Sequence, residues 1–346
     1  MKILITGGAG FLGLHLTSHL NKKGNKLTLV DIQKFDKTEY PHNTVLAVCD
    51  VRNKKELDKL IKDKDVIIHA AAALPLWKKD DIYSTNVDGT GNVLELAKKH
   101  KIKRIIFISS TAVYGVPKKH PIIETDPRVG VGPYGESKIL AEDLCFRAIQ
   151  EGQHITILRP KTFVGTGRLG VFEILFDWIH DGKTIPIIGK GENRYQLLDV
   201  DDLVEAIYQF SLKNTSIYNG AFNIGAEQFG TVEKDLGELF KFAKSGSKIF
   251  PTPAFIVKKA LWFFEKIRVS PLYQWVYDTA DKDSFVSIEK LKKTLGWKPR
   301  YSNAEALIKS YRWYLENYSK IKSKTSGVTH TVGWKQGILK LFKYFA

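Results

Sequence analysis

Short apolar runs alternate with amphipathic segments through the first half of the chain. Each run has the length of a strand, and the segments between them repeat apolar residues at helical spacing. The runs cover 2–6, 26–30, 45–51, 66–70 and 104–108, and the helical patterns cover 12–21, 54–61 and 82–100. This alternation predicts an α/β fold with a doubly wound parallel sheet that helices cover on both faces.

A glycine-rich turn, GGAGFLG at 7–13, joins the first run to the first helical pattern. Glycine permits the unusual backbone angles of such a turn, lets the backbone approach a pyrophosphate, and lets the helix pack tightly on the strand. The free amides at the start of the helix then face the phosphates. The turn therefore suggests a dinucleotide site, although a glycine-rich turn can also be a turn only.

Two further features fit a bound dinucleotide. Asp31 ends the second run, 18 residues beyond Gly13, where a carboxylate can accept hydrogen bonds from both hydroxyls of an adenosine ribose. It would repel a 2′-phosphate, which favours NAD over NADP, although Lys34 lies nearby. Residues 70–73 are four alanines, small enough for a ribose or nicotinamide to lie on their backbone, or for a helix to pack on them.

A Tyr-x-x-x-Lys pair, Tyr134 and Lys138, opens a later amphipathic segment and shares one helical face. The same spacing occurs at Tyr114, in a loop flanked by Gly and Pro, and at Tyr318, near a basic tail. Only Tyr134 opens the helix that follows the strand predicted at 104–108. That strand runs into Ser109-Ser-Thr111 at its carboxyl end, where open α/β sheets bind ligands.

These side chains suit proton and hydride transfer. A tyrosine with a pKa near ~10 is a poor base, and lowering that pKa by roughly three units requires about 4 kcal/mol of phenolate stabilisation. The ammonium of Lys138 and a positive nicotinamide can supply it. Tyr134 would then take the proton of a substrate hydroxyl while the hydride passes to the nicotinamide. Ser110 would hold the reacting oxygen, and Lys138 would also grip the nicotinamide ribose.

Charge and composition narrow the partners. The 346 residues carry 53 Lys and Arg against 37 Asp and Glu, a net charge of +16. Six lysines and no acid lie within 317–346, so much of the excess belongs to the tail, and we expect no nucleic-acid partner. Cys49 and Cys145 form no Cys-x-x-Cys or Cys/His cluster, so we expect no disulfide and no metal site. No apolar run reaches 18 residues, and we expect a cytoplasmic protein.

The tail has two parts. Residues 319–331 are polar and basic without periodicity, which predicts a linker. Trp334, Ile338, Leu341 and Phe345 then repeat at helical spacing among lysines, which predicts a short amphipathic basic helix. This helix could lie peripherally on an anionic membrane, or pack on a partner subunit or on the rest of the chain.

Together with the glycine turn, Asp31 and the Tyr134–Lys138 pair, several segments resemble the extended short-chain dehydrogenases/reductases, in the NAD-dependent epimerase/dehydratase group. These segments are Asp50-Val51, His69-Ala-Ala71, Asn86, residues 109–115 and Arg159-Pro160. The resemblance covers roughly residues 1–315. It implies NAD as cofactor and a homodimer.

The resemblance also assigns roles to residues. Ser110, Tyr134 and Lys138 take the catalytic positions. The dinucleotide contacts are Gly7, Gly10, Phe11, Leu12, Gly13, Asp31, Asp50, Val51, Ala70, Ala71 and Lys138, and Thr111 and Arg194 are expected at the substrate. Members that dehydrate sugars carry an Asp-Glu pair where this chain has Thr111 and Ala112, so dehydration is not expected.

Two reactions stay open at this point. The first is epimerisation of a nucleotide-activated or lipid-linked sugar through a transient ketone, with Arg194 on the pyrophosphate. The second is NAD(P)-dependent oxidation or reduction of a hydrophobic alcohol or ketone, as in the 3β-hydroxysteroid dehydrogenase and dihydroflavonol reductase branches. Aromatic stretches at 255–264 and 272–278 favour the second, unless they only pack in a core. We expect epimerisation.

The domain organisation follows from these patterns. We expect an NAD-binding Rossmann domain at 1–165 and a lobe at 166–318 that mainly binds substrate and returns segments to the first domain. The basic linker and amphipathic tail occupy 319–346.

Overall fold

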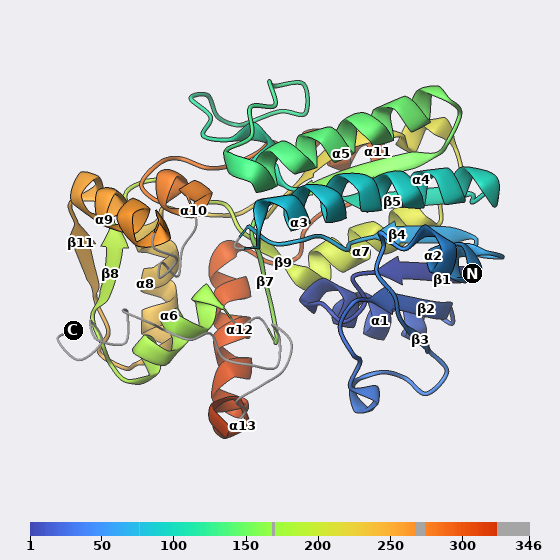
Figure 1. Cartoon of the computed structure of the whole chain (residues 1–346). Helices are drawn as coiled ribbons and strands as arrows, with labels where there is room; N and C mark the ends of the chain where they lie inside the picture. The colour runs from blue at the N-terminus through green and yellow to red at the C-terminus, as the bar shows by residue number, and fades with distance from the viewer. Residues whose placement is uncertain (76, 168–169, 267–273, 324–346) are drawn as a thin grey trace.

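The computed structural model describes residues 1–75, 77–167, 170–266 and 274–323. Within them, seven parallel strands form one sheet in the order β10-β6-β5-β4-β1-β2-β3 (Figure 1). The strands are β1 (Lys2–Thr6), β2 (Lys26–Asp31), β3 (Val45–Val48), β4 (Val66–His69), β5 (Arg104–Ile108), β6 (Ile155–Pro160) and β10 (Gly220–Ile224). The chain winds outward from β1 in both directions, which confirms the predicted doubly wound Rossmann fold.

Helices cover both faces of the sheet. On one face, α1 (Phe11–Lys22) packs beside α7 (Val200–Ser211). On the other, α2 (Lys54–Ile61), α4 (Gly89–Lys99) and α5 (Gly132–Gln150) lie side by side (Figure 1). Successive residues of a strand point to opposite faces, so Ile3 packs in the core under α1 and Leu4 in the core under α4. Both layers are therefore apolar, as the continuous apolar runs predict.

A second lobe lies beyond the carboxyl ends of the strands, on the left in Figure 1. Two short parallel pairs belong to it or connect it to the sheet: β8 (Ile185–Ile188) with β11 (Ile249–Thr252), and β7 (Phe163–Val164) with β9 (Leu198–Asp199). Its helices are α6 (Val171–His180), α8 (Val232–Ala243), α9 (Ala254–Lys266), α10 (Gln274–Thr279), α12 (Asn303–Glu316) and α13 (Tyr318–Ser323). Side chains of α6, α8 and α12 share a core.

The chain passes between the two parts more than once. After β9, helix α7 and strand β10 return to the sheet, where β10 pairs with β6. Helix α11 (Glu289–Leu295) then packs on β10 before the chain re-enters the lobe as α12. These returns place the carboxyl edge of the sheet between the two parts.

The structure corrects three predicted boundaries. The strand expected at 45–51 ends at Val48. The helix expected at 82–100 is interrupted by a π-helical turn at Ser84–Asp88, where the amide of Asn86 exchanges hydrogen bonds with the backbone of Ala73. The linker expected from 319 begins as helix α13, because Ile321 is buried and Tyr318 stacks on His180. The amphipathic helix expected at 334–345 lies outside the described residues.

Two features of the described residues bear on partners. None of their helices is both long and apolar enough to cross a bilayer. They also contain no cluster of three or more His, Cys, Asp or Glu side chains arranged to hold a metal ion. Cys49 and Cys145 are both buried and unpaired with each other.

Candidate active site

A cavity of about 400 Å³ opens at the carboxyl edge of the sheet. The ends of β1, β2, β4 and β5 contribute to its wall, together with the start of α5 and Phe163 of β7. The residues predicted from the sequence that line it are Gly7, Gly10, Phe11, Leu12, Asp31, Asp50, Val51, Ala70, Ala71, Tyr134 and Lys138. The remaining predicted residues, Gly13, Ser110, Thr111 and Arg194, are not among its described lining residues.

The glycine turn has the shape that a phosphate site needs. Gly7 has a φ of +74°, and a Cβ there would lie 2.8 Å from the backbone of Ala70 and Ala71. Gly10 caps α1 without a side-chain hydrogen bond, so the first amides of the helix remain available to an anion. Gly13 serves packing instead, because a Cβ there would lie 2.4 Å from the carbonyl oxygen of Gly7.

The carboxylate of Asp31 is held at the end of β2. Its Oδ2 accepts a hydrogen bond from the amide of Ala9, and its Oδ1 accepts one from the amide of Gln33. Both contacts fix the carboxylate at the wall of the cavity, next to the glycine turn. This placement fits the hydroxyls of an adenosine ribose, as we expect from the sequence.

Asp50 is paired with a residue that the sequence analysis did not single out. Arg52 donates to both carboxylate oxygens of Asp50 and also to Asp81 and Ser84. These hydrogen bonds lower the pKa of Asp50 and raise that of Arg52. Both side chains line the cavity, so Arg52 joins the end of the sheet to the π-helical turn. The sequence could have predicted this ion pair, since Arg52 follows Asp50 by only two residues.

The four alanines form one wall of the cavity. The amide of Ala71 donates to the hydroxyl of Thr6, and the amide of Ala73 donates to Asn86 Oδ1. The segment is therefore held through its backbone from two sides, and its small side chains leave the cavity open. Opposite them, Phe11 stacks on Phe163 with ring centroids 5.9 Å apart, a contact between distant segments that no local pattern predicts.

Tyr134 and Lys138 both face the cavity from the first turns of α5. The ammonium of Lys138 donates to the carbonyl oxygen of Ile108 at 2.9 Å and lies 4.9 Å from the ring centroid of Phe107. Burial lowers its pKa to about 8, against the opposing charge of Glu142. Lys138 thus stays mainly charged at neutral pH, near the position where a phenolate would form.

The two serines at the end of β5 have different partners. The Ser109 hydroxyl donates to Glu142 Oε1 at 2.6 Å, and Ser109 lines the cavity. Ser110 accepts a hydrogen bond from the amide of Ala112, which begins a 3₁₀ turn at Thr111–Tyr114. Its hydroxyl proton therefore remains available to donate to a ligand.

The two predicted substrate residues lie elsewhere. Thr111 is buried, and its hydroxyl donates to the carbonyl oxygen of Pro160. Arg194 is exposed, with its guanidinium 4.7 Å from the ring of Phe229 and 4.6 Å from that of Phe285. The structure therefore gives Arg194 an aromatic setting away from the described cavity wall.

Glu142 connects the site to the interior. It is fully buried on α5 and accepts hydrogen bonds from Arg159 on both oxygens, at 2.8 and 2.7 Å. Arg128 donates to it as well, and Arg159 also donates to Tyr114. Tyr114 is thus a buried structural tyrosine. The network fixes the end of β5 against α5. It therefore also fixes how far the serines lie from Lys138.

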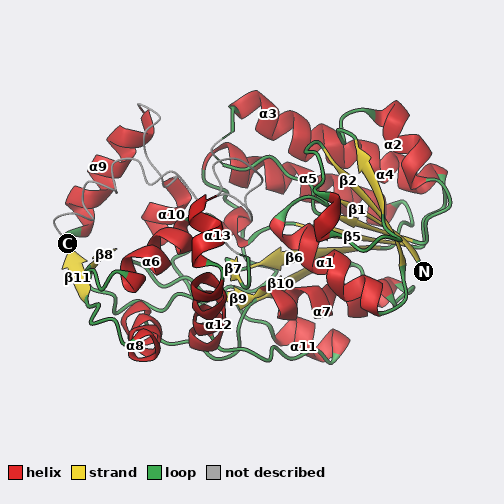
Figure 2. Cartoon of the chain, turned by 90° about the horizontal axis from the view of Figure 1, so that it is seen from below, coloured by secondary structure: helices red, strands yellow, loops and turns green. Residues whose placement is uncertain are grey.

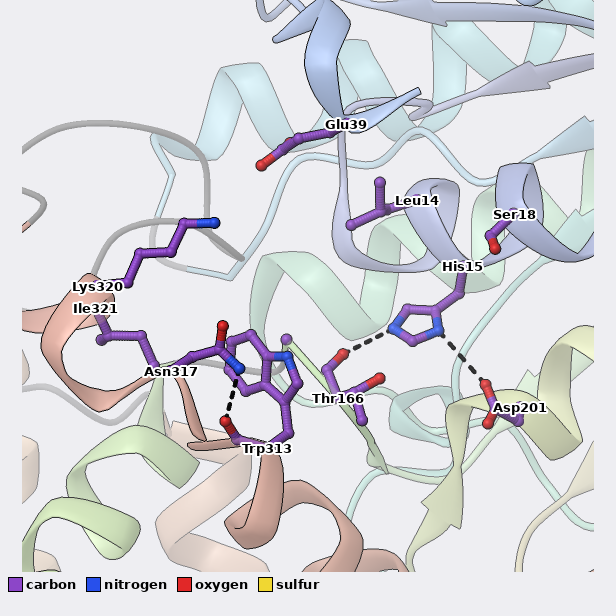
Figure 3. Close-up of a pocket in the computed structure, with 11 residues that line it drawn as sticks. Leu14, His15, Ser18, Glu39, Thr166, Asp201, Trp313, Asn317, Lys320 and Ile321 are labelled. Carbon is purple, nitrogen blue, oxygen red and sulfur yellow. Dashed lines mark hydrogen bonds and ion pairs between the residues drawn. The ribbon is translucent and has the colours of Figure 1, made fainter. Parts of the chain in front are cut away.

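A second cavity, of about 490 Å³, lies between α1 and the helices α12 and α13 (Figure 3). His15 spans its wall, with Nε2 2.8 Å from the carbonyl oxygen of Thr166 and Nδ1 3.5 Å from Asp201 Oδ1. Trp313 and Lys320 line it from the lobe. No predicted site residue is among its described lining residues, so it joins the two parts without belonging to the first cavity.

Comparisons with known proteins agree with this geometry. Residues 3–225 match the NAD dependent epimerase/dehydratase family. The chain is 32% identical to the uncharacterized protein y4nG of Sinorhizobium fredii (strain NBRC 101917 / NGR234), over 99% of this chain and 85% of that one. It is 28% identical to a UDP-N-acetyl-alpha-D-glucosaminuronate decarboxylase of Bacillus cytotoxicus, over 91% and 98%. It is 26% identical to a UDP-glucose 4-epimerase of Halalkalibacterium halodurans, over 92% and 96%.

A solved structure shows the same fold. The UDP-glucuronic acid 4-epimerase of Bacillus cereus in complex with NAD superposes with a TM-score of 0.76 at 24% identity, over 92% of this chain and 100% of that one. The first cavity is lined by the glycine turn, the carboxylate of Asp31 and small residues, as a dinucleotide site requires. The chain therefore belongs to the NAD-dependent epimerase/dehydratase family of the extended short-chain dehydrogenases/reductases, and its cofactor is NAD.

Proposed function

We propose that this chain epimerises a sugar carried on a nucleoside diphosphate, through a transient ketone at the inverted carbon. The observation that carries the proposal is the joint presence of Tyr134 and Lys138 in the wall of the dinucleotide cavity. Two of the relatives named above, the decarboxylase and the 4-epimerase, act on UDP-sugars by their names, which supports a nucleotide sugar as the substrate class.

The residues would hold NAD along the edge of the sheet. The amides at the start of α1 would bind the pyrophosphate, and Asp31 would accept hydrogen bonds from the adenosine ribose. Asp50, Val51, Ala70 and Ala71 also line the cavity and would contact the bound dinucleotide. Bound NAD supplies a hydride acceptor that becomes the donor when the ketone is reduced from its opposite face.

The protein's own groups then handle the proton. Tyr134 as phenolate takes the proton of the sugar hydroxyl and returns it when the alcohol is formed again. Lys138 would stabilise the phenolate by its charge. The hydroxyl of Ser110, one residue beyond Ser109 of the cavity wall, would donate a hydrogen bond to the reacting oxygen. Because proton and hydride both return to the substrate, the reaction has no net oxidation.

Dehydration and steroid-like oxidation are less well supported. Residues 111 and 112 are Thr and Ala, both buried, so neither an acid nor a base stands there to expel a hydroxyl. The aromatic stretch at 255–264 exposes Phe255, Trp262 and Phe263 on the surface of α9 and lines neither described cavity. The first aromatic stretch therefore lies outside both described cavities, and Trp275 and Tyr277 of the second stretch are buried.

Replacement of Tyr134 by Phe tests the proposal. We expect turnover to fall by roughly 10²–10⁴-fold, because the proton carrier is lost, while bound NAD is retained. Tyr318→Phe is the matched control, since Tyr318 has the same Tyr-x-x-x-Lys spacing but stacks on His180 outside the cavity. It should leave turnover unchanged.

The assay is a panel of UDP-sugars, including UDP-glucose and UDP-glucuronic acid, with products separated by chromatography. An epimerase yields an isomer of equal mass and no net change in absorbance at the NADH band. Stoichiometric NADH formation, release of carbon dioxide, or full turnover by Tyr134→Phe would each contradict the proposal.

A further inference from the structure

Helix α9 carries its large apolar side chains on the outside of the molecule. Phe255 is 70% exposed, Ile256 64%, Trp262 51% and Phe263 55%. At 3.6 residues per turn, these positions and Lys259 fall on one side of the helix. We call Phe255, Ile256, Lys259, Trp262 and Phe263 the α9 face. A helix that is apolar on its outer side needs a partner to cover it.

The orientation of α9 is fixed by its inner side. Val257, Leu261 and Phe264 are half-buried there, and the helix packs against β8 and α10. Lys258 forms an ion pair with Asp281 and donates to the carbonyl oxygen of Asp278. The helix therefore cannot bury the α9 face by rotating without breaking these contacts.

The chain around α9 is rich in lysine. Residues 239–264 contain five lysines and no acidic residue, and two of the lysines, Lys241 and Lys258, pair with Glu238 and Asp281. Lys259 lies within the α9 face itself, its ammonium 4.3 Å from the ring centroid of Phe255. Phe250, just before the helix on β11, adds a further exposed aromatic ring.

The position of α9 suits a flat surface. The helix lies at the outer end of the lobe, far from the sheet, in both views (Figures 1 and 2). Protein interfaces deplete lysine at their centre, whereas lipid headgroups accept an ammonium beside inserted aromatic rings. Lys259 lies in the middle of the apolar side chains, which favours a lipid surface over a protein partner.

We propose that the α9 face docks on an anionic lipid bilayer, with Phe255, Trp262 and Phe263 inserted at the headgroup level and Lys259 on lipid phosphates. The surface lies apart from the dinucleotide cavity and does not depend on which sugar is the substrate. Peripheral binding of this kind combines buried apolar area with attraction to anionic lipids.

Sedimentation of the full-length chain with vesicles tests the proposal. One set of vesicles is phosphatidylcholine alone, and the other contains phosphatidylglycerol. We expect binding to the second set, at least tenfold weaker for Trp262→Ser with Phe263→Ser, and weaker also for Lys259→Glu. Ile217→Ser is the matched control, because Ile217 is 69% exposed on the 3₁₀ turn at Ser216–Tyr218 and should bind like the unaltered chain.

Three results would overturn the proposal. The first is no sedimentation of the unaltered chain with anionic vesicles. The second is undiminished vesicle binding by both α9 variants. If removal of residues 324–346 then abolishes binding, the tail and not the α9 face holds the membrane. The third is a smaller oligomer for the Trp262→Ser, Phe263→Ser variant in light scattering, which would make the face a contact between copies. Circular dichroism confirms that each variant is folded.

Discussion

The charge of Lys138 is set by two opposing effects at the residue scale. Its ammonium is removed from water, which lowers its pKa to about 8, and the carboxylate of Glu142 one turn further along α5 opposes that shift. Its hydrogen bond to the carbonyl oxygen of Ile108 fixes the amine beside the cavity. A charge held in this way can lower the pKa of a neighbouring phenol without moving during the reaction.

Substitution of Lys138 by Met tests this role. With Tyr134 as the proposed proton carrier, loss of the positive charge should raise the pKa of its phenol, so turnover near neutral pH should fall by roughly 10²-fold or more. The acidic limb of the plot of kcat against pH should move to higher pH. Lys322→Met, in the pair Tyr318–Lys322 of the same spacing, is the control. A profile of unchanged shape for Lys138→Met would exclude an electrostatic role.

At the scale of elements, the turn between β1 and α1 is fixed by close backbone contacts. Gly7 abuts the end of β4, and Gly13 abuts the carbonyl oxygens of Gly7 and Gly8. The turn is thus packed between a strand and its own helix, and this packing fixes the amides that we propose for the pyrophosphate.

Gly13→Ala should therefore destabilise the fold by about 1–3 kcal/mol and weaken NAD binding, because the added methyl must displace backbone. Gly91→Ala on α4 is the matched control. Its nearest neighbour would be Leu144 Cδ1 at 3.9 Å, and helical alanine should stabilise the chain by about 0.4–1 kcal/mol. Chemical denaturation and NAD titration measure both effects. Equal stability of the two variants would show that the turn can relax.

Elements with strong local signals were predictable from the sequence. The apolar runs predicted the strands of the sheet. The glycine turn and Asp31 predicted that the dinucleotide cavity lies at the carboxyl edge of the sheet. Contacts between distant segments were not predictable, such as Phe11 on Phe163 or the hydrogen bonds of Asn86 that accompany the π-helical turn. Which of two adjacent serines lines the cavity depends on a one-residue alternation at the end of β5, and periodicity cannot resolve that.

At the scale of the whole molecule, Asp201 ties the two parts together. It lies at the start of α7, 3.5 Å from His15 of α1, and 2.6 Å from the ammonium of Lys309 on α12. The hydrogen bond from His15 and the neighbouring Lys309 hold the pKa of Asp201 well below its usual range. The Rossmann domain and the lobe thus share one carboxylate beside the second cavity (Figure 3).

The lowered pKa of Asp201 predicts that the stability of the fold depends on pH. A depressed carboxyl pKa adds stability above the unfolded value of about 3.9, and that stability is lost as pH falls through the folded value. Asp201→Asn should therefore lower the free energy of unfolding near neutral pH. The loss should be less than about 1 kcal/mol because the carboxylate is partly exposed. The difference from the unaltered chain should shrink in acid. A difference that grows in acid would contradict this assignment.

The burial of Glu142, Arg159 and Lys138 bears on how the site responds to dissolved salt. All three side chains are almost completely removed from solvent. Dissolved ions screen exposed charges strongly but penetrate such interiors poorly. We therefore expect the Arg159–Glu142 ion pair beside the dinucleotide cavity to respond less to ionic strength than the exposed ion pairs of the same molecule.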